Sequence, residues 1–120
     1  MSRMVAVRSL TRSTTLVQRV RVARRPWERM IGLLGKRSLE PDEALLIPHC
    51  RSVHTWFMRF PLDLVFLDGA GVVVRILEHL PAFRVVWVRG AEAVLELPAG
   101  TVARTLTQRG ERFQIVEGER

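Results

Sequence analysis

A short stretch in the middle of the chain holds the side chains best suited to chemistry. Within the sequence VHTWFMRFPLDLVF, His54, Trp56 and Met58 occupy alternate positions. Residues two apart share a face of an extended segment, so we expect residues 53–60 to be extended, with imidazole, indole and thioether converging. Imidazole and thioether are ligands that Cu(I) accepts, and an indole face attracts cations.

The same stretch is short of ligands for a complete metal site. Such a site needs three or four ligands, and this one offers His54 and Met58, with Cys50 as a third candidate from the preceding loop. The chain contains no C-x₂-C or H-E-x-x-H pattern. In the alternative interpretation, Trp56 and Met58 belong to the core and His54 is hydrogen-bonded within it. The sequence therefore identifies no cofactor.

Two carboxylates interrupt apolar runs. Asp63 lies in PLDLVF and Glu96 lies in VLELPAG. A carboxylate in a strand covered on both faces must find a partner or shift its pKa, and two such acids together can perform general acid–base catalysis. A structural salt bridge or a water-facing side chain is the alternative at each position. Sequence spacing does not show whether the two acids meet.

Alternation and turn residues predict a chain of short strands. The expected strands cover residues 14–23, 44–47, 62–67, 72–77, 85–88, 93–97 and 113–116, and the expected helices cover 26–35 and 101–108. The link Asp68-Gly69-Ala70-Gly71 predicts a tight hairpin between two almost wholly apolar strands. That hairpin is expected to be central and covered on both faces.

The strand count predicts the fold class. About seven short strands, two short helices and no long βαβ spacing favour a mainly β protein, a compact antiparallel β-sandwich or barrel. A length of 120 residues fits one domain, and a 48% hydrophobic composition supplies a core.

Positive charge is concentrated at the start of the chain. The net charge is +7, but residues 1–37 carry nine arginines and one lysine against Glu28 alone, and the remainder is slightly acidic. A basic arm of this kind can contact nucleic acid or anionic lipid, and a solubilising face is the alternative. Only Trp27 lies among the arginines, so the arm offers charge without a platform for stacking bases. The arginines considered for it are Arg19, Arg21, Arg24, Arg25, Arg29 and Arg37.

The termini and the single cysteine bear on location. Residues 1–12 are rich in Arg and Ser and lack an apolar signal segment, so we expect a flexible basic leader followed by one domain over 13–120. One cysteine excludes an internal disulfide and suits a reducing compartment. No apolar run reaches the roughly 20 residues of a membrane span. These features predict a cytoplasmic protein.

Three motifs together resemble a known family. ERMIGLLGKRSL, HTWFMRFPLDLVFLDGAG and LELPAG occur in the order and spacing of the DUF192 family of small prokaryotic proteins, which has no established function. The resemblance implies a compact, jelly-roll-like β-sandwich with a small helical element. It implies no catalytic mechanism. Where many relatives carry a Lys-Asn-Thr-like stretch after the Met, this chain has Arg59-Phe60.

The sequence leaves three functions open. The leading hypothesis is a module that binds a small ligand or a protein, with its site around His54, Trp56, Met58, Asp63 and Glu96. The second is a small enzyme that uses the buried carboxylates, with or without a metal. The third is a protein that associates with nucleic acid through its basic N-terminal third.

Overall fold

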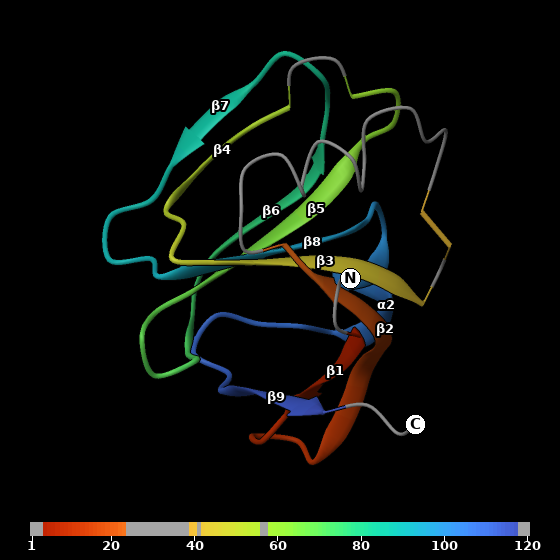
Figure 1. Ribbon diagram of the computed structural model, residues 1–120, viewed down its shortest axis with the longest axis vertical. Helices are drawn as coiled ribbons and strands as arrows, with labels where there is room; N and C mark the ends of the chain where they lie inside the picture. The colour runs from red at the N-terminus through yellow and green to blue at the C-terminus, as the bar shows by residue number, and fades with distance from the viewer. Residues whose placement is uncertain (1–3, 24–38, 41, 56–57, 118–120) are drawn as a thin grey trace.

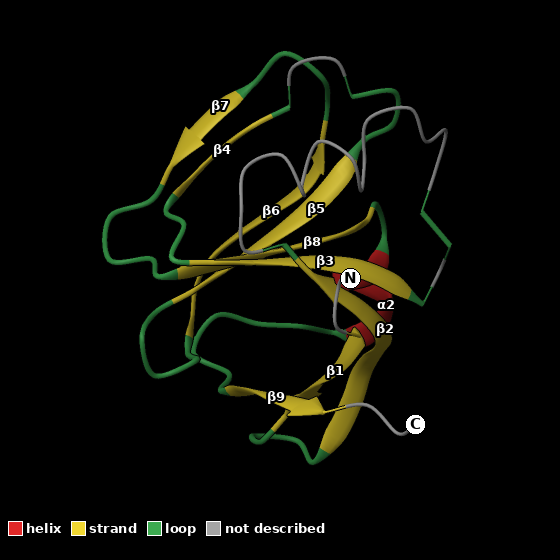
Figure 2. Ribbon diagram, viewed as in Figure 1, coloured by secondary structure: helices red, strands yellow, loops and turns green. Residues whose placement is uncertain are grey.

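The chain folds mainly into β-strands, which confirms the predicted fold class (Figures 1 and 2). The computed structural model describes residues 4–23, 39–40, 42–55 and 58–117. The strands are β1 (Met4–Ser9), β2 (Thr14–Val22), β3 (Glu43–Pro48), β4 (Ser52–His54), β5 (Leu62–Leu67), β6 (Val73–Leu80), β7 (Val85–Trp87), β8 (Ala93–Pro98) and β9 (Phe113–Glu117), and helix α2 covers Thr101–Thr105. The helix expected over 26–35 lies outside the described residues.

Most of the described strands belong to one sheet. Seven strands pair in the order β6-β5-β8-β3-β2-β1-β9, and β4 pairs with β7 in a separate two-stranded sheet. Among the described strands, β2 and β3 are the one parallel pair. The large sheet does not close into a barrel, so β6 and β9 remain its edges. Among the described helices, none has the length and apolar character that crossing a membrane requires.

The centre of the large sheet is covered on both faces. All six residues of β5 are buried, and two separate apolar clusters lie against its two sides. The first cluster packs side chains of β5 and β8 against those of β1, β2, β9 and α2. The second packs side chains of β5 and β8 against those of β4, with the partly buried Val86 of β7 beside them. Figure 1 shows these two groups of strands on opposite sides of β3 and β8. Each fully buried Leu or Val contributes roughly 1.5–3 kcal/mol, so the doubly covered strands form the stable centre.

The second strand of the predicted hairpin, β6, is less buried than expected. The prediction of coverage on both faces is confirmed for β5 but is wrong for β6, where Arg75 and Glu78 are exposed. The physical reason is that β6 lies at the edge of the sheet order, where the two apolar clusters cover its residues after Val73 only partly. Charged side chains on such an edge discourage pairing with another chain.

Part of the expected N-terminal leader forms a strand. The prediction of a flexible leader over 1–12 is wrong for Met4–Ser9, which form β1 and pair with both β2 and β9. Val5 and Val7 are 1% and 0% exposed and point into the first cluster. The strand was not predicted because the segment is rich in Arg and Ser and its alternation of buried and outward residues is short.

A polar cluster holds the start of the chain to its end. The Glu111 carboxylate accepts a hydrogen bond from Ser9 Oγ at 2.7 Å and pairs with Arg12 Nε at 2.8 Å through the same oxygen. Its other oxygen accepts from the Gln108 backbone N–H at 2.6 Å. Burial alone would raise the pKa of Glu111, but the hydrogen bonds from Arg12, Ser9 and Gln108 and the charge of Arg12 outweigh it and lower that pKa.

Because the pKa of Glu111 is lowered by folding, the free energy of unfolding depends on pH. Because the carboxyl ionises more readily in the folded state, its contribution is complete above the ordinary value of 4.5 and is lost as the pH falls through the lowered pKa. Glu111→Gln should cost about 1–3 kcal/mol at neutral pH, because charge-assisted hydrogen bonds are lost. Urea unfolding from pH 7 to pH 3 should show the variant losing less stability than the wild type on acidification. Parallel curves for the two proteins would contradict this assignment.

Candidate functional site

The expected convergence of His54 and Met58 does not occur. Strand β4 ends at His54, and the Met58 backbone N–H donates to the Thr55 carbonyl oxygen at 3.2 Å. The prediction that residues 53–60 are extended is confirmed for Val53 and His54 but is wrong for Arg59 and Phe60, where the chain bends. His54 is exposed, whereas Met58 is 7% exposed and belongs to the second apolar cluster. Trp56 lies outside the described residues.

The cysteine thiol takes part in a local backbone contact. Cys50 is half-buried, and its Sγ donates to the Ser52 carbonyl oxygen at 3.0 Å. Within the described ranges, no three His, Cys, Asp or Glu side chains gather closely enough to hold a metal ion. The predicted ligand set of Cys50, His54 and Met58 includes a thioether, which such a group of side chains does not count, and it stays a prediction.

Asp63 connects three segments through backbone hydrogen bonds. Its side chain is 0% exposed. Oδ1 accepts from the His79 N–H at 2.9 Å, and Oδ2 accepts from Gly100 at 3.1 Å and Val102 at 2.9 Å. A carboxylate that accepts three N–H bonds is well satisfied although buried. Asp63 thus joins β5 to the end of β6 and to the turn that begins α2.

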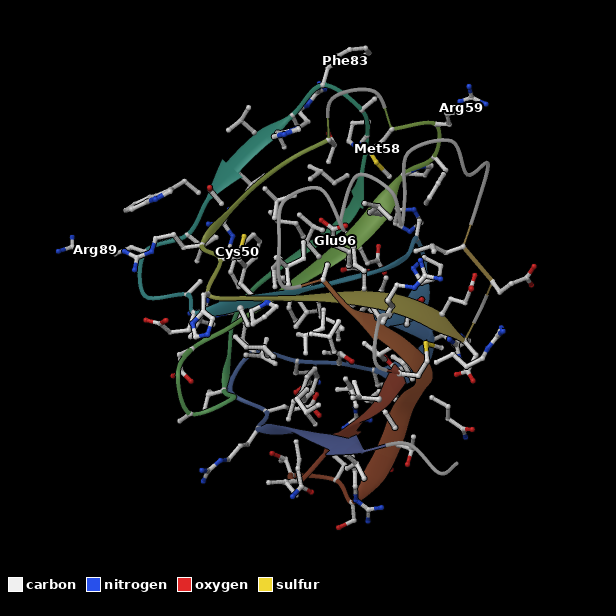
Figure 3. The ribbon with its side chains drawn as sticks, viewed as in Figure 1. Cys50, Met58, Arg59, Phe83, Arg89 and Glu96 are labelled. Carbon is white, nitrogen blue, oxygen red and sulfur yellow. The ribbon has the colours of Figure 1, made fainter. Side chains whose placement is uncertain are left out.

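Glu96 lies on the other face of the same sheet. It pairs in register with Leu45 on β3 and Leu64 on β5, whose side chains belong to the second cluster, and it is 0% exposed. Asp63 pairs with Leu97, one position along β8, and alternate residues point to opposite faces. Figure 3 shows Glu96 and Met58 in the layer between the large and small sheets. The two carboxylates are therefore separated by the sheet and do not form an acid–base pair.

A threonine that the sequence did not single out organises the loop before β7. Thr55 is 1% exposed, and its Oγ1 donates to the Pro81 carbonyl at 2.6 Å while accepting from the Arg84 N–H at 2.9 Å. Its own N–H donates to the Arg84 carbonyl, and its carbonyl accepts from the Phe83 N–H. These bonds hold Phe83 at a φ of 63°, a conformation that bulky residues adopt rarely.

The outer face of the small sheet carries exposed apolar side chains. In the antiparallel register, Ser52 lies opposite Trp87 and His54 lies opposite Val85, so these four residues share one face. Phe83, Val85 and Trp87 are 63%, 68% and 60% exposed, and we call them the β7 stripe. Large apolar side chains grouped in this way are typical of interaction sites.

An open pocket lies beside the stripe. Its volume is about 540 Å³, and six residues line it: Val74, Arg75, Trp87, Val88, Arg89 and Arg109. They come from the edge strand β6, from β7 and the turn after it, and from the turn between α2 and β9. Figure 3 shows Arg89 extending outward near the end of β7. We call this site the arginine–tryptophan pocket.

The charged side chains described around this pocket are all positive. Among the described residues that line it, three carry guanidinium groups and none carries a carboxylate. Within the described part of the chain, the side chains of Arg75, Arg89 and Arg109 take part in no hydrogen bond or ion pair. Like charges gathered in a concave site attract anions, and guanidinium groups match the geometry of carboxylate and phosphate.

Comparison with known families accounts for nearly the whole chain. The DUF192 family model, described as "Uncharacterized ACR", matches residues 8–115. The chain belongs to the DUF192 family. This confirms the resemblance drawn from the three motifs. None of the curated proteins compared with the chain matches it.

Two solved structures share this DUF192 fold. A protein of Sinorhizobium meliloti 1021, described as a "putative transcription regulator", has 28% sequence identity and a TM-score of 0.76, over 96% of this chain and 94% of that one. A protein of unknown function from Novosphingobium aromaticivorans DSM 12444 has 23% identity and a TM-score of 0.77, over 92% of this chain and 83% of that one. The second likeness concerns the fold alone.

The role assigned to Asp63 is tested by removing one of its acceptors. Asp63→Asn replaces one acceptor oxygen by an NH₂ group that faces a backbone N–H, and we expect a loss of about 2–4 kcal/mol. Asp68→Asn is the matched control, because Asp68 uses a single oxygen, Oδ1, to accept from both Ala70 and Val72, and an Asn side chain retains such an oxygen. Equal urea midpoints for the two variants would overturn this assignment.

The role of Thr55 is tested with an isosteric side chain. Thr55→Val removes the hydroxyl bonds to Pro81 and Arg84 while keeping the shape, so we expect a loss of about 1–3 kcal/mol. Thr55→Ser should retain most of the stability. Hydrogen exchange of the Arg84 amide should be faster in Thr55→Val than in Thr55→Ser, and unchanged exchange would show that Thr55 does not hold this loop.

Proposed function

We propose that this DUF192 protein is a binding module that holds an anionic ligand in the arginine–tryptophan pocket. The observation that carries the proposal is the lining of that pocket, whose described residues include three arginines and an exposed tryptophan and no carboxylate. A volume of about 540 Å³ lies within the range of small-ligand sites, which is roughly 300–1,000 Å³.

The side chains around the pocket suit recognition more than catalysis. Arg75, Arg89 and Arg109 supply donors for a phosphate or carboxylate group, and Trp87 supplies a flat apolar surface for the remainder of the ligand. Because the three arginines come from separate segments of the fold, the ligand would bind where those segments meet.

This proposal moves the site away from the residues first considered. The leading hypothesis of a binding module is retained, but Asp63 and Met58 serve the fold and Glu96 lies in the interior. His54 is the member of the predicted set that lies near the proposed site, since it faces outward opposite Val85. The description of the Sinorhizobium protein as a "putative transcription regulator" fits a protein that acts by binding.

The enzyme hypothesis finds less support in the geometry. Its two acids, Asp63 and Glu96, point from opposite faces of a strand pair, and Asp63 is already committed to three N–H donors. General acid–base catalysis requires both groups within reach of one substrate. A single substrate does not reach both faces of a covered sheet.

Calorimetric titration with inorganic pyrophosphate tests the proposed function. Pyrophosphate should bind the wild type, and Arg75→Gln or Arg109→Gln should weaken binding roughly three- to tenfold, because each removes a charge-assisted hydrogen bond in a solvent-open site. The control is Arg19→Gln, which removes the same charge from exposed Arg19 on β2, three strands away from β5 and four from β6 in the sheet order.

The control separates a site from general attraction. The proposal requires that Arg19→Gln bind like the wild type. It fails if the wild type does not bind pyrophosphate, or if all three variants weaken binding equally, since overall positive charge would then be responsible.

A further inference from the structure

The geometry points to single-stranded nucleic acid as the ligand of the arginine–tryptophan pocket and the β7 stripe. This inference rests on the proposed anion-binding function and deepens it. It uses a second observation that a small anion does not explain, the exposed apolar stripe beside the pocket.

Aromatic and basic residues lie close together in the segment that contains β7. The segment FRVVWVR, residues 83–89, places Phe83 and Trp87 on the stripe, with Arg84 between them and Arg89 following. Both aromatic side chains are about three-fifths exposed. Proteins that bind single strands combine aromatic side chains, on which bases stack, with a positively charged groove that follows the phosphates.

The backbone that carries the β7 stripe is held in place by hydrogen bonds. The buried Thr55 network fixes the backbone from Pro81 to Arg84, including the left-handed conformation of Phe83. Strand pairing with β4 then fixes Val85 and Trp87. Aromatic rings presented on a fixed backbone lose little conformational entropy on stacking.

Other possible occupants fit the pocket and the stripe less well. A second copy of the chain would meet this surface through a twofold interface, which brings the same patch against itself and places arginines against arginines. An uncharged apolar partner would leave the guanidinium groups buried without a counter-charge. A partner with both flat apolar faces and regularly spaced negative charges satisfies the stripe and the pocket together.

This surface suits unpaired bases better than paired ones. Phe83, Val85 and Trp87 carry one hydrogen-bonding side-chain group between them, the indole N–H of Trp87, which is too little to read a series of base edges in a groove. Helix α2 has five residues, and no longer helix lies among the described residues. Base faces become available for stacking only when the strands are separate.

Fluorescence anisotropy with a labelled oligothymidylate of about 16 nucleotides tests the inference. We expect the wild type to bind this single strand at least tenfold more tightly than the corresponding thymidylate–adenylate duplex. Trp87→Ala should weaken binding roughly tenfold. Ile115→Ala, which removes a 40% exposed side chain on β9 at the opposite edge of the large sheet, should have no effect.

The salt dependence tests the pocket separately from the stripe. The logarithm of the affinity should fall linearly with the logarithm of the salt concentration. Arg75→Gln should reduce that slope by about 0.7, the contribution of one phosphate contact in a single strand. Arg19→Gln should leave the slope unchanged, and Trp87→Ala should lower the affinity at every salt concentration without changing the slope.

Several outcomes would overturn the inference. They are duplex binding as tight as single-strand binding, an unaffected Trp87→Ala variant, and tighter binding to polyglutamate or to phosphatidylserine vesicles than to the oligonucleotide. If pyrophosphate binds in the pocket but the oligonucleotide does not, this inference fails while the proposed anion-binding function stands. If neither binds, both fail.

Discussion

The hydrogen bonding of one buried carboxylate defines what the central sheet of this protein can do. Asp63 lies in a strand that is covered on both faces, and its two oxygens accept N–H groups from the end of β6 and from the start of α2. A buried carboxylate is tolerated when its acceptors are filled. Once they are filled by the backbone, the group is no longer available to a ligand, and the doubly covered centre becomes a scaffold.

A centre committed to structure leaves the edges of the fold as the place for the proposed binding site. The β4–β7 sheet covers one face of the large sheet with Val53 and Val86 and turns its other face outward. Edge strand β6 brings Arg75 beside it, and the turn before β9 adds Arg109. Groups that bind ligands need a rigid support and solvent access, and both are found where the small sheet meets this edge.

Local sequence patterns predicted the strands, whereas the positions of the candidate site residues depend on long-range strand pairing. The hairpin link at Asp68-Gly69-Ala70-Gly71 and the alternation of β2 were readable because their signals lie within a few residues. The opposite orientations of Asp63 and Glu96 depend on the register of β5 against β8, which no local pattern encodes. Thr55 interrupted an apparently extended segment through bonds to residues 81–84. The strand over 85–88 was predicted, but the arginines that line the pocket beside it, at 75 and 109, come from distant parts of the chain.

Protection of a sheet edge is a second reason for exposed arginines, since charges prevent edge strands from pairing with other chains. That function accounts for Arg75 on β6 and for Arg84 beside β7. It does not account for the β7 stripe, because exposed Phe, Val and Trp side chains on a short edge strand promote the association that the charges oppose. The two features are reconciled by a partner that needs both, one that carries negative charge and presents flat apolar surfaces. The arrangement of this edge therefore favours recognition over simple solubility.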